Sequence, residues 1–327
     1  MPHYTHHVGI DVAKDLLDVH LLPQGLAFRC PNSAQGIARM LVRIRKAVPA
    51  DGDEVLAGIA FACEATGGHE RTLLVELNER GLDVWCLHPA DIRAFARLLG
   101  TRAKSDALDA RLIAQAAATA AASRPPTRLT RQCSVLRELV AIRRHAQGQI
   151  STLKSQLASS ASRPAIRRLG AMLRRHARDL SQIEGEIDDI IRNDPDCRQQ
   201  AARLRDVPGI GPVFTSEVIA NLPELGTVSS RQIASLVGVA PHPRQSGNSK
   251  RGGKCQGGRA SLRKTLYMVA LSAMRMKHHP LKPFYDRLRA SGKPAKVAIV
   301  AVMRKLLTML NAMFKTNSQW TPHIQKT

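Results

Sequence analysis

The stretch His7-Val-Gly-Ile-Asp-Val12 places a carboxylate inside an apolar run. Ile10 and Val12 flank Asp11, and such β-branched neighbours predict a strand of a buried sheet. A carboxylate is costly to bury there unless a cation or hydrogen bonds compensate. The stretch therefore predicts a sheet whose first strand carries an acid with a chemical task. The alternative is an acid that only forms a turn.

The residues that follow alternate between short strands and helices as far as about residue 122. Residues 17–22 alternate apolar and polar side chains with a period of two, which predicts a second strand. Ser33 is expected to cap a helix that runs to Lys46. Further strands are expected near 27–30, over 55–63 and over 83–87, and further helices over 69–80 and from Ala90 onward. This alternation predicts an α/β unit.

Breaks that contain proline divide the chain into three predicted domains. Ser123-Arg-Pro-Pro126 closes an α/β domain over 1–124. Residues 125–192 predict a helical hairpin or coiled coil, which serves either oligomerisation or spacing. A mainly helical domain is expected over 193–327. Its helices are expected near 213–221, 229–237, 260–277 and 295–315.

The chain is strongly basic. Its 327 residues hold 49 Lys and Arg against 26 Asp and Glu, a formal net charge of +23. Such an excess points to a polyanionic partner, and nucleic acid is the commonest one. Because aromatic residues make up only 3% of the chain, base stacking is a poor explanation for binding, and phosphate contacts from Arg and Lys must dominate.

A membrane surface is the rival partner for this charge. The apolar run over 297–303 is shorter than the roughly 18–20 residues of a span and ends at Arg304, so no membrane association is expected. Asp11 and Asp15 interrupt the amino terminus before any signal-like stretch. The six scattered cysteines include no CxxC pair, which is typical of reduced thiols in a cytosol rather than of a disulfide frame or zinc site.

Three further carboxylates form a pattern with Asp11, and we call the four the acidic tetrad. Glu64 follows a predicted buried strand, while Asp106 and Asp109 project about 60° from each other on a predicted helix. Taken singly, these acids are ordinary loop, N-cap or first-turn residues. Together they match the ribonuclease-H-like layout, in which acids from two strands and the closing helix hold magnesium for phosphodiester chemistry.

Two glycine-containing segments predict contacts with phosphate. In Val207-Pro-Gly-Ile-Gly-Pro212, a helix–hairpin–helix pattern, Gly209 and Gly211 let backbone amides approach a phosphate, although a helix turn can need glycine for geometry alone. The segment Pro243–Lys254 (PRQSGNSKRGGK) has no apolar side chain. It is either a solvated linker or a flexible loop that presents a serine to DNA. The cations expected to contact nucleic acid are Lys14, Lys104, Arg244, Lys250, Arg251, Lys254, Arg263 and Lys264.

Five motifs in order resemble one family. They are Gly9–Lys14, Glu64–Gly67, Lys104–Ala110, Val207–Gly211 and Ser246–Ser249. Together they resemble the DEDD-type insertion-sequence transposases, the IS-one-ten family, which is related to the Piv DNA invertases. The resemblance spans about residues 7–315. The family often has Thr where this chain has Ser105, and that exchange keeps the hydroxyl.

The resemblance implies a transposase or site-specific DNA recombinase. Its RuvC-like domain would hold Mg²⁺, or Mn²⁺ as a substitute, at the acidic tetrad. A coiled-coil segment would lead to a transposase domain whose nucleophilic serine maps to Ser246, with Ser249 as the competing candidate. The resemblance also implies a structured bridge RNA that pairs with donor and target DNA. It further implies a homodimer that assembles into a tetramer with a composite active site, in the cytoplasm of a bacterium and associated with its nucleoid.

Three other functions compete with this one. A RuvC-like junction-resolving nuclease would use water and need no serine. A basic architectural DNA-binding protein would have lost its carboxylates, whereas all four are present here. Actin-like kinases use a related fold but place a glycine-rich turn directly after the first-strand acid, and Asp11 is followed by Val-Ala-Lys14 instead.

Overall fold

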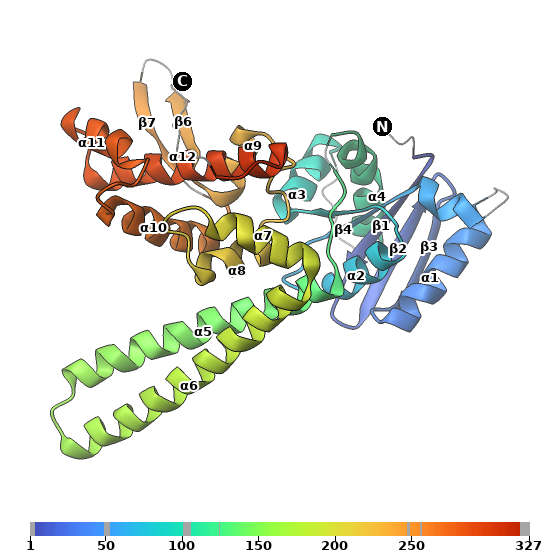
Figure 1. Cartoon of the computed structure of the whole chain (residues 1–327). Helices are drawn as coiled ribbons and strands as arrows, with labels where there is room; N and C mark the ends of the chain where they lie inside the picture. The colour runs from blue at the N-terminus through green and yellow to red at the C-terminus, as the bar shows by residue number, and fades with distance from the viewer. Residues whose placement is uncertain are drawn as a thin grey trace. The chain divides into compact units, whose positions relative to one another are not determined.

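The computed structural model describes residues 4–48, 53–100, 106–123, 125–246, 249–255 and 257–320, without the side chains of 53–54, 106–108 and 242–254. The chain forms two compact units, unit 1 (Met1–Ser134) and unit 2 (Val135–Thr327) (Figure 1). Nearly all of the helical segment predicted as a separate domain over 125–192 belongs to unit 2. The three-domain division stays a prediction.

Unit 1 is built on a five-stranded sheet in the order β3-β2-β1-β4-β5. Its strands are β1 (His6–Val12), β2 (Leu16–Leu22), β3 (Leu26–Pro31), β4 (Ile59–Glu64) and β5 (Val84–Leu87). Strands β1, β2 and β3 form an antiparallel meander. Strand β4 runs parallel to both β1 and β5. The sheet confirms the predicted α/β fold, and four of its strands lie close to their predicted ranges. The strand expected over 55–63 is shorter than predicted, because β4 begins at Ile59 and a 3-10 helix precedes it.

Helices cover both faces of this sheet. They are α1 (Ala34–Ala47), α2 (Arg71–Glu79), α3 (Pro89–Leu98) and α4 (Asp106–Ser123), and a short 3-10 helix, η1 (Asp53–Gly58), precedes β4. Ser33 caps α1 as predicted, since its hydroxyl accepts a hydrogen bond from the Gly36 amide at 3.1 Å. The face that carries Ile10 and Phe61 packs with α1 and α2. The opposite face packs against α4.

Helix α4 comes unusually close to β1 because of Gly9. A methyl group built on Gly9 would collide with the backbone of Ala110 and Ala114 in α4. Only glycine leaves room for this approach. The contact brings the first turns of α4 directly onto the strand that carries Asp11.

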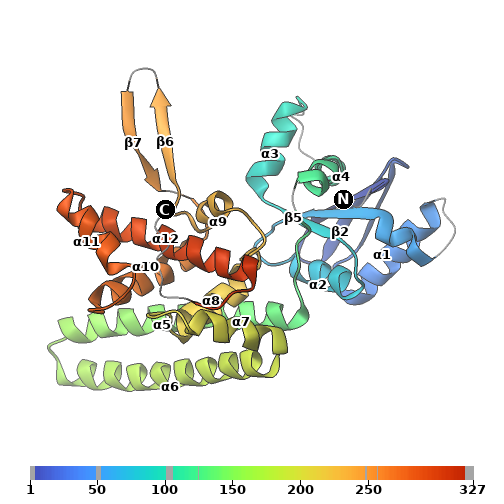
Figure 2. The ribbon, with the colours of Figure 1, turned by 45° about the horizontal axis from the view of Figure 1, so that its top comes forward.

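A long helical hairpin begins unit 2. Helices α5 (Arg131–Ser159) and α6 (Arg163–Asn193) lie side by side in both views (Figures 1 and 2), and Ser162 caps α6. This confirms the helical hairpin predicted over 125–192. The inner ends of the hairpin join the core of unit 2 through residues such as Leu136, Val140, Ile187 and Ile191.

The rest of unit 2 is mainly helical, as predicted. Its helices are α7 (Pro195–Arg205), α8 (Pro212–Asn221), α9 (Ser230–Val237), α10 (Ala260–Arg275), α11 (Lys282–Ala290) and α12 (Ala295–Thr316). One prediction is wrong. The flexible loop expected over 243–254 instead forms most of a hairpin of two antiparallel strands, β6 (Pro241–Ser246) and β7 (Ser249–Cys255). The dipeptide Gly-Asn between Ser246 and Ser249 is typical of a two-residue hairpin connection.

Helix α12 lies where it was predicted, and it continues past Arg304, where the apolar run of the sequence ends. The helix continues to Thr316, and by length and composition alone it could cross a membrane. Half of its most apolar window is buried within the protein. Val302, Leu306 and Leu310 are fully buried in the core of unit 2. The helix therefore has the surroundings of a core helix.

Candidate catalytic site and nucleic-acid-binding groove

Asp11 and Glu64 lie next to each other at the ends of two parallel strands. Ile10 of β1 pairs with Cys63 of β4, so the next residues along the two strands are Asp11 and Glu64. Neighbouring strands are about 4.8 Å apart, and side chains in register leave the sheet on the same face. Ala62, two residues before Glu64, packs in the cluster that contains α4. Both acids therefore lie on the face that α4 covers.

Helix α4 supplies the other two acids of the tetrad. Its first residue is Asp106, whose side chain lies outside the described residues. Asp109 is half-buried and precedes Ala110, whose backbone faces Gly9 on β1. The structure thus brings Asp11, Glu64 and Asp109 to one face of the sheet, although they are far apart in the sequence.

The chemistry of this face suits a hard divalent cation, but the described side chains do not enclose one. Among the residues whose side chains are described, no three His, Cys, Asp or Glu groups are close enough to hold a metal ion. Magnesium is commonly held by one or two carboxylates together with water and substrate phosphates. Asp11 and Glu64, which end adjacent strands, offer carboxylates of the kind that this mode of binding uses.

A fifth carboxylate, which the sequence analysis missed, lies beside the tetrad. Asp18 of β2 pairs in register with Asp11 on one side and with Arg29 of β3 on the other. The row across the sheet is therefore Glu64, Asp11, Asp18 and Arg29. Arg29 donates from Nε and Nη2 to the two carboxylate oxygens of Asp18, at 2.9 and 3.0 Å. This bidentate pair offsets the repulsion between two acids on neighbouring strands.

Asn32, which the sequence analysis also missed, joins the two loops that follow β1 and β4. Its Nδ2 donates to the carbonyl of Ala13 and to that of His69, both at 3.0 Å. The first carbonyl belongs to the turn after β1 and the second to the loop after Glu64. The side chain therefore ties together the segments that follow the two strand acids. Lys14, predicted to contact nucleic acid, lies exposed on the same turn.

Glu70 fixes the shape of the loop that begins at Glu64. Its Oε2 accepts hydrogen bonds from the amides of Thr66 and Gly68 at 3.1 and 2.9 Å, and from the Thr66 hydroxyl at 3.1 Å. Burial raises the pKa of the Glu70 carboxyl, but these hydrogen bonds outweigh it and lower the pKa overall. A charged Glu70 thus holds the loop in place and has a structural role.

Unit 2 contains an open groove of about 1410 Å³. It is lined by four residues predicted to contact nucleic acid, namely Gly209, Gly211, Arg263 and Lys264. Arg143 and Arg144 of α5 and Lys296 of α12 also line it. The structure therefore gathers cations from distant parts of the chain along one concave surface, which sequence spacing could not reveal.

The helix–hairpin–helix segment presents backbone amides to this groove. Gly209 has a φ of +87°, a left-handed conformation that glycine adopts readily. Gly211 precedes α8 and supplies no side-chain cap, so the first amides of the helix lack an intrahelical acceptor. His279, buried in the core, contacts the Pro208 carbonyl through Nε2 at 3.2 Å and supports the turn. The segment matches the predicted pattern.

Several of the groove cations also make structural contacts. Arg263 donates to the carbonyl of Gly257 and, at 3.4 Å, to that of Val237. Arg144 lies 3.5 Å from the buried carboxylate of Glu217. Burial raises the pKa of Glu217, and Arg144 opposes that shift. The buried carboxylate of Glu217 therefore helps to position one arginine of the groove.

Ser246 and Ser249 face each other across the end of the β6–β7 hairpin as a register pair. Arg244 pairs with Arg251 along the same two strands. The side chains of Ser246, Ser249, Arg244, Lys250, Arg251 and Lys254 lie outside the described residues, as does the whole of Lys104. The backbone alone shows that both candidate serines are at the tip of a ribbon rich in cations.

The fold and the position of the acids are typical of enzymes that act on phosphodiesters. A five-stranded α/β sheet with acids on two adjacent strands and on the helix that covers them is suited to metal-dependent chemistry on phosphodiesters.

Comparison with known proteins narrows this class to one family. The family described as "Transposase", of the DEDD, IS110 type, matches residues 8–161. The family described as "Transposase IS116/IS110/IS902 family" matches residues 201–286. The two matches together cover most of the chain. It therefore belongs to the IS110-type transposase family and is an enzyme that acts on DNA as a transposase or recombinase.

Individual relatives agree with this assignment. The "Pilin gene-inverting protein" of Moraxella lacunata is 25% identical over 98% of this chain and 99% of its own length. The protein of the same name from Moraxella bovis matches equally well. A 44.8 kDa protein of insertion element IS116 from Streptomyces clavuligerus is 31% identical over 44% of this chain and 35% of its own length.

Proposed function

We propose that this transposase cuts and rejoins DNA through a serine nucleophile on the β6–β7 hairpin, assisted by a divalent cation at the acidic tetrad. The observation that supports the proposal is that Asp11 and Glu64 end adjacent strands on the face of the sheet that is covered by α4, the helix of Asp109. The family membership makes DNA the substrate. It also favours a divalent metal, for which we propose Mg²⁺, with Mn²⁺ as a substitute.

The tetrad would hold the cation through hard carboxylate oxygens. Asp11 and Glu64 approach from adjacent strands, while Asp106 and Asp109 approach from the start of α4. When bound, the ion would offset negative charge on a scissile phosphate. Gly9 and Asn32 would act as positioning residues, because one lets α4 approach β1 and the other ties the neighbouring loops together.

In the proposed reaction, Oγ of Ser246 attacks the phosphorus of a phosphodiester. The Ser246 hydroxyl loses its proton as the phosphoserine ester forms, the bond to one deoxyribose oxygen breaks, and that oxygen takes up a proton and leaves as a hydroxyl. Rejoining reverses these steps with the hydroxyl of another strand, so the bond energy is conserved. Arg244, Lys250, Arg251 and Lys254 would neutralise the charge that develops on the phosphorane.

We further propose a structured guide RNA that pairs with donor and target DNA, and a homodimer that assembles into a tetramer. The net charge of +23 and the cationic groove of unit 2 favour a large polyanionic partner. Gly209, Gly211, Arg263 and Lys264 would contact its backbone in the groove. The α5–α6 hairpin would join protomers, and the protein would act in the cytoplasm near the nucleoid. Recombination that survives complete ribonuclease treatment would refute the guide.

The metal site is tested by the variant Asp11→Asn. We expect loss of strand cleavage with DNA affinity changed by only a small factor, because Arg and Lys carry the binding. Asp15→Asn is the matched control, since Asp15 is exposed on the turn after β1. Cleavage and binding are measured on the same preparations with Mg²⁺ and with Mn²⁺. Full cleavage by Asp11→Asn would remove the tetrad from the mechanism.

A further inference from the structure

The outer half of α6 has a charge pattern that none of the sites above uses. Residues 163–178 contain six arginines and no acid, whereas the five acids of the helix all lie between Asp179 and Asp189. The side chains of all six arginines are exposed. A charge run of this kind can be an ordinary solvated surface, so its geometry decides whether it forms a site.

Four of these arginines lie on a single face of the helix. At about 100° per residue, Arg163, Arg167, Arg174 and Arg178 fall within about 60° of one another. We call these four residues the basic stripe. The remaining two, Arg168 and Arg175, lie about 100° further round the helix.

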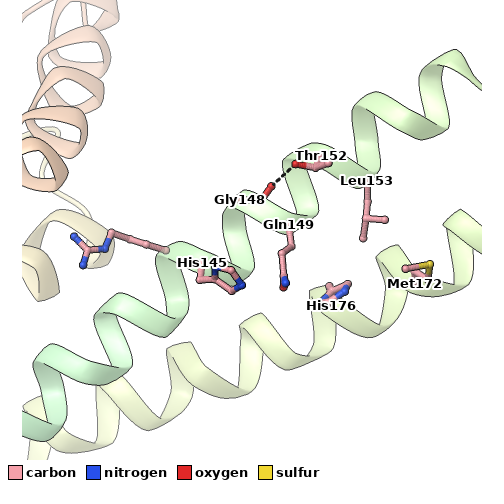
Figure 3. A pocket seen from close by; sticks show the side chains of 8 residues that line it. His145, Gly148, Gln149, Thr152, Leu153, Met172 and His176 are labelled. Atoms are coloured by element: carbon pink, nitrogen blue, oxygen red, sulfur yellow. Dashed lines mark hydrogen bonds between the residues drawn. The ribbon is translucent and has the colours of Figure 1, made fainter. Parts of the chain in front are cut away.

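The basic stripe faces away from the partner helix. Leu169, Leu173 and Leu180 are partly buried on the opposite side of α6. Figure 3 shows Met172 and His176 of α6 pointing toward α5, where they line a pocket of about 560 Å³ with His145 and Gln149. Since the α5-facing side is identified in this way, the stripe is on the outer surface of the hairpin.

The dimensions of the stripe suit a nucleic-acid backbone. From Arg163 to Arg178 it is about 22 Å long, at about 1.5 Å per residue. Gly170 and Ala171 lie between its two pairs of arginines and place no bulky side chain there. Duplex DNA carries one charge per about 1.7 Å of its axis, so a stretch of this length offers more phosphates than the stripe has arginines.

The charge of the stripe is also uncompensated within the described part of the chain. No ion pair is found there for any of its four arginines. At the inner, acidic end of the helix the cations are paired, with Arg192 at 3.1 Å from Asp189 and Arg205 at 3.2 Å from Asp188. The protein thus neutralises one end of the helix internally and leaves the other end for an external anion.

We propose that the basic stripe of α6 binds the phosphate backbone of duplex DNA, as a contact separate from the acidic tetrad and from the groove of unit 2. DNA is the occupant because the enzyme acts on DNA as a transposase or recombinase. Contacts to phosphate are independent of sequence, so the stripe would add affinity without selecting a site. The hairpin would then act as an arm that holds DNA during recombination.

Two double variants of the full-length protein form a matched test. Arg167→Gln with Arg174→Gln removes two charges from the stripe, and Arg168→Gln with Arg175→Gln removes two from the neighbouring face. Both pairs are seven residues apart on the same helix and change the net charge equally. Binding of a 30-base-pair DNA duplex without a recombination site is measured by fluorescence anisotropy over a range of salt concentrations. Circular dichroism checks that both variants keep their helices.

We expect the stripe variant to bind DNA roughly tenfold more weakly than the wild type. The slope of log K against the logarithm of the salt concentration should become less steep by about 2, since about one counterion is released per phosphate contact. The neighbouring-face variant should lose less than half as much. Equal losses in the two variants would show a net-charge effect and overturn the proposal. So would a stripe variant that loses binding to duplex RNA but not DNA. Loss of self-association in light scattering, with DNA binding unchanged, would assign the stripe to a second copy of α6 and also overturn it.

Discussion

At the scale of single residues, the site depends on how acids are spaced across the sheet. Glu64, Asp11 and Asp18 occupy neighbouring positions on three strands. Without compensation such a row would repel itself. Arg29 provides compensation at one end through its two hydrogen bonds to Asp18. Asp11 and Glu64, further along the row, lie on the face of the sheet that α4 covers.

This arrangement predicts a coupling between Arg29 and Asp18. Arg29→Ala should lower the free energy of unfolding by about 0.5–1 kcal/mol, a modest loss because the Arg29 side chain is 54% exposed. Adding Asp18→Asn should restore part of the loss, because it removes the acid left unpaired beside Asp11. Urea unfolding of the wild type, of the two single variants and of the double variant measures the effect. Additive losses in the double variant would show that the two side chains do not act as a pair.

At the scale of elements, the approach of α4 to β1 decides where Asp109 lies. The space for that approach exists only because Gly9 has no side chain. Helix α4 packs its small side chains, including Ala114 and Ala117, against the sheet. A displacement of this helix would therefore carry Asp109 away from the strand acids, even though no acid itself had changed.

Gly9→Ala tests this dependence. The added methyl group should push α4 from the sheet, lower the free energy of unfolding by about 1–3 kcal/mol, and reduce DNA cleavage. Gly58→Ala is the matched control, because a methyl group at Gly58 meets nothing within 4 Å and its φ is not positive. Thermal unfolding and a cleavage assay are run on both variants. Unchanged cleavage by a folded Gly9→Ala protein would contradict the role given to this close contact.

At the scale of the whole molecule, the sequence predicted where helices and strands lie along the chain better than it predicted which residues contact one another. Period-two alternation, the Ser33 cap and the proline breaks predicted the sheet, α1 and the α5–α6 hairpin correctly, since these signals are local. The Asp18–Arg29 pair was missed because it depends on strand register. The cationic groove unites residues from α5 to α12, and no local pattern links them.

The serine segment shows the other kind of error. Its lack of apolar side chains suggested a flexible loop, but backbone pairing of β6 with β7 needs no apolar alternation. The proposed nucleophile is therefore carried on a paired ribbon rather than on a free loop, which positions its backbone more closely than the sequence suggested.

The proposed mechanism depends on the serine nucleophile, and trapping the covalent intermediate tests it most directly. Labelled DNA that carries a recombination site is incubated with the wild-type protein, with Ser246→Ala and with Ser249→Ala, and denaturing gels reveal DNA attached to protein. We predict an adduct with the wild type and with Ser249→Ala, and none with Ser246→Ala. An adduct or full recombination with Ser246→Ala would contradict this role of Ser246, and an adduct would assign the nucleophile to another side chain. DNA cleavage without an adduct in any of the three proteins would favour a RuvC-like nuclease in which water attacks the phosphate.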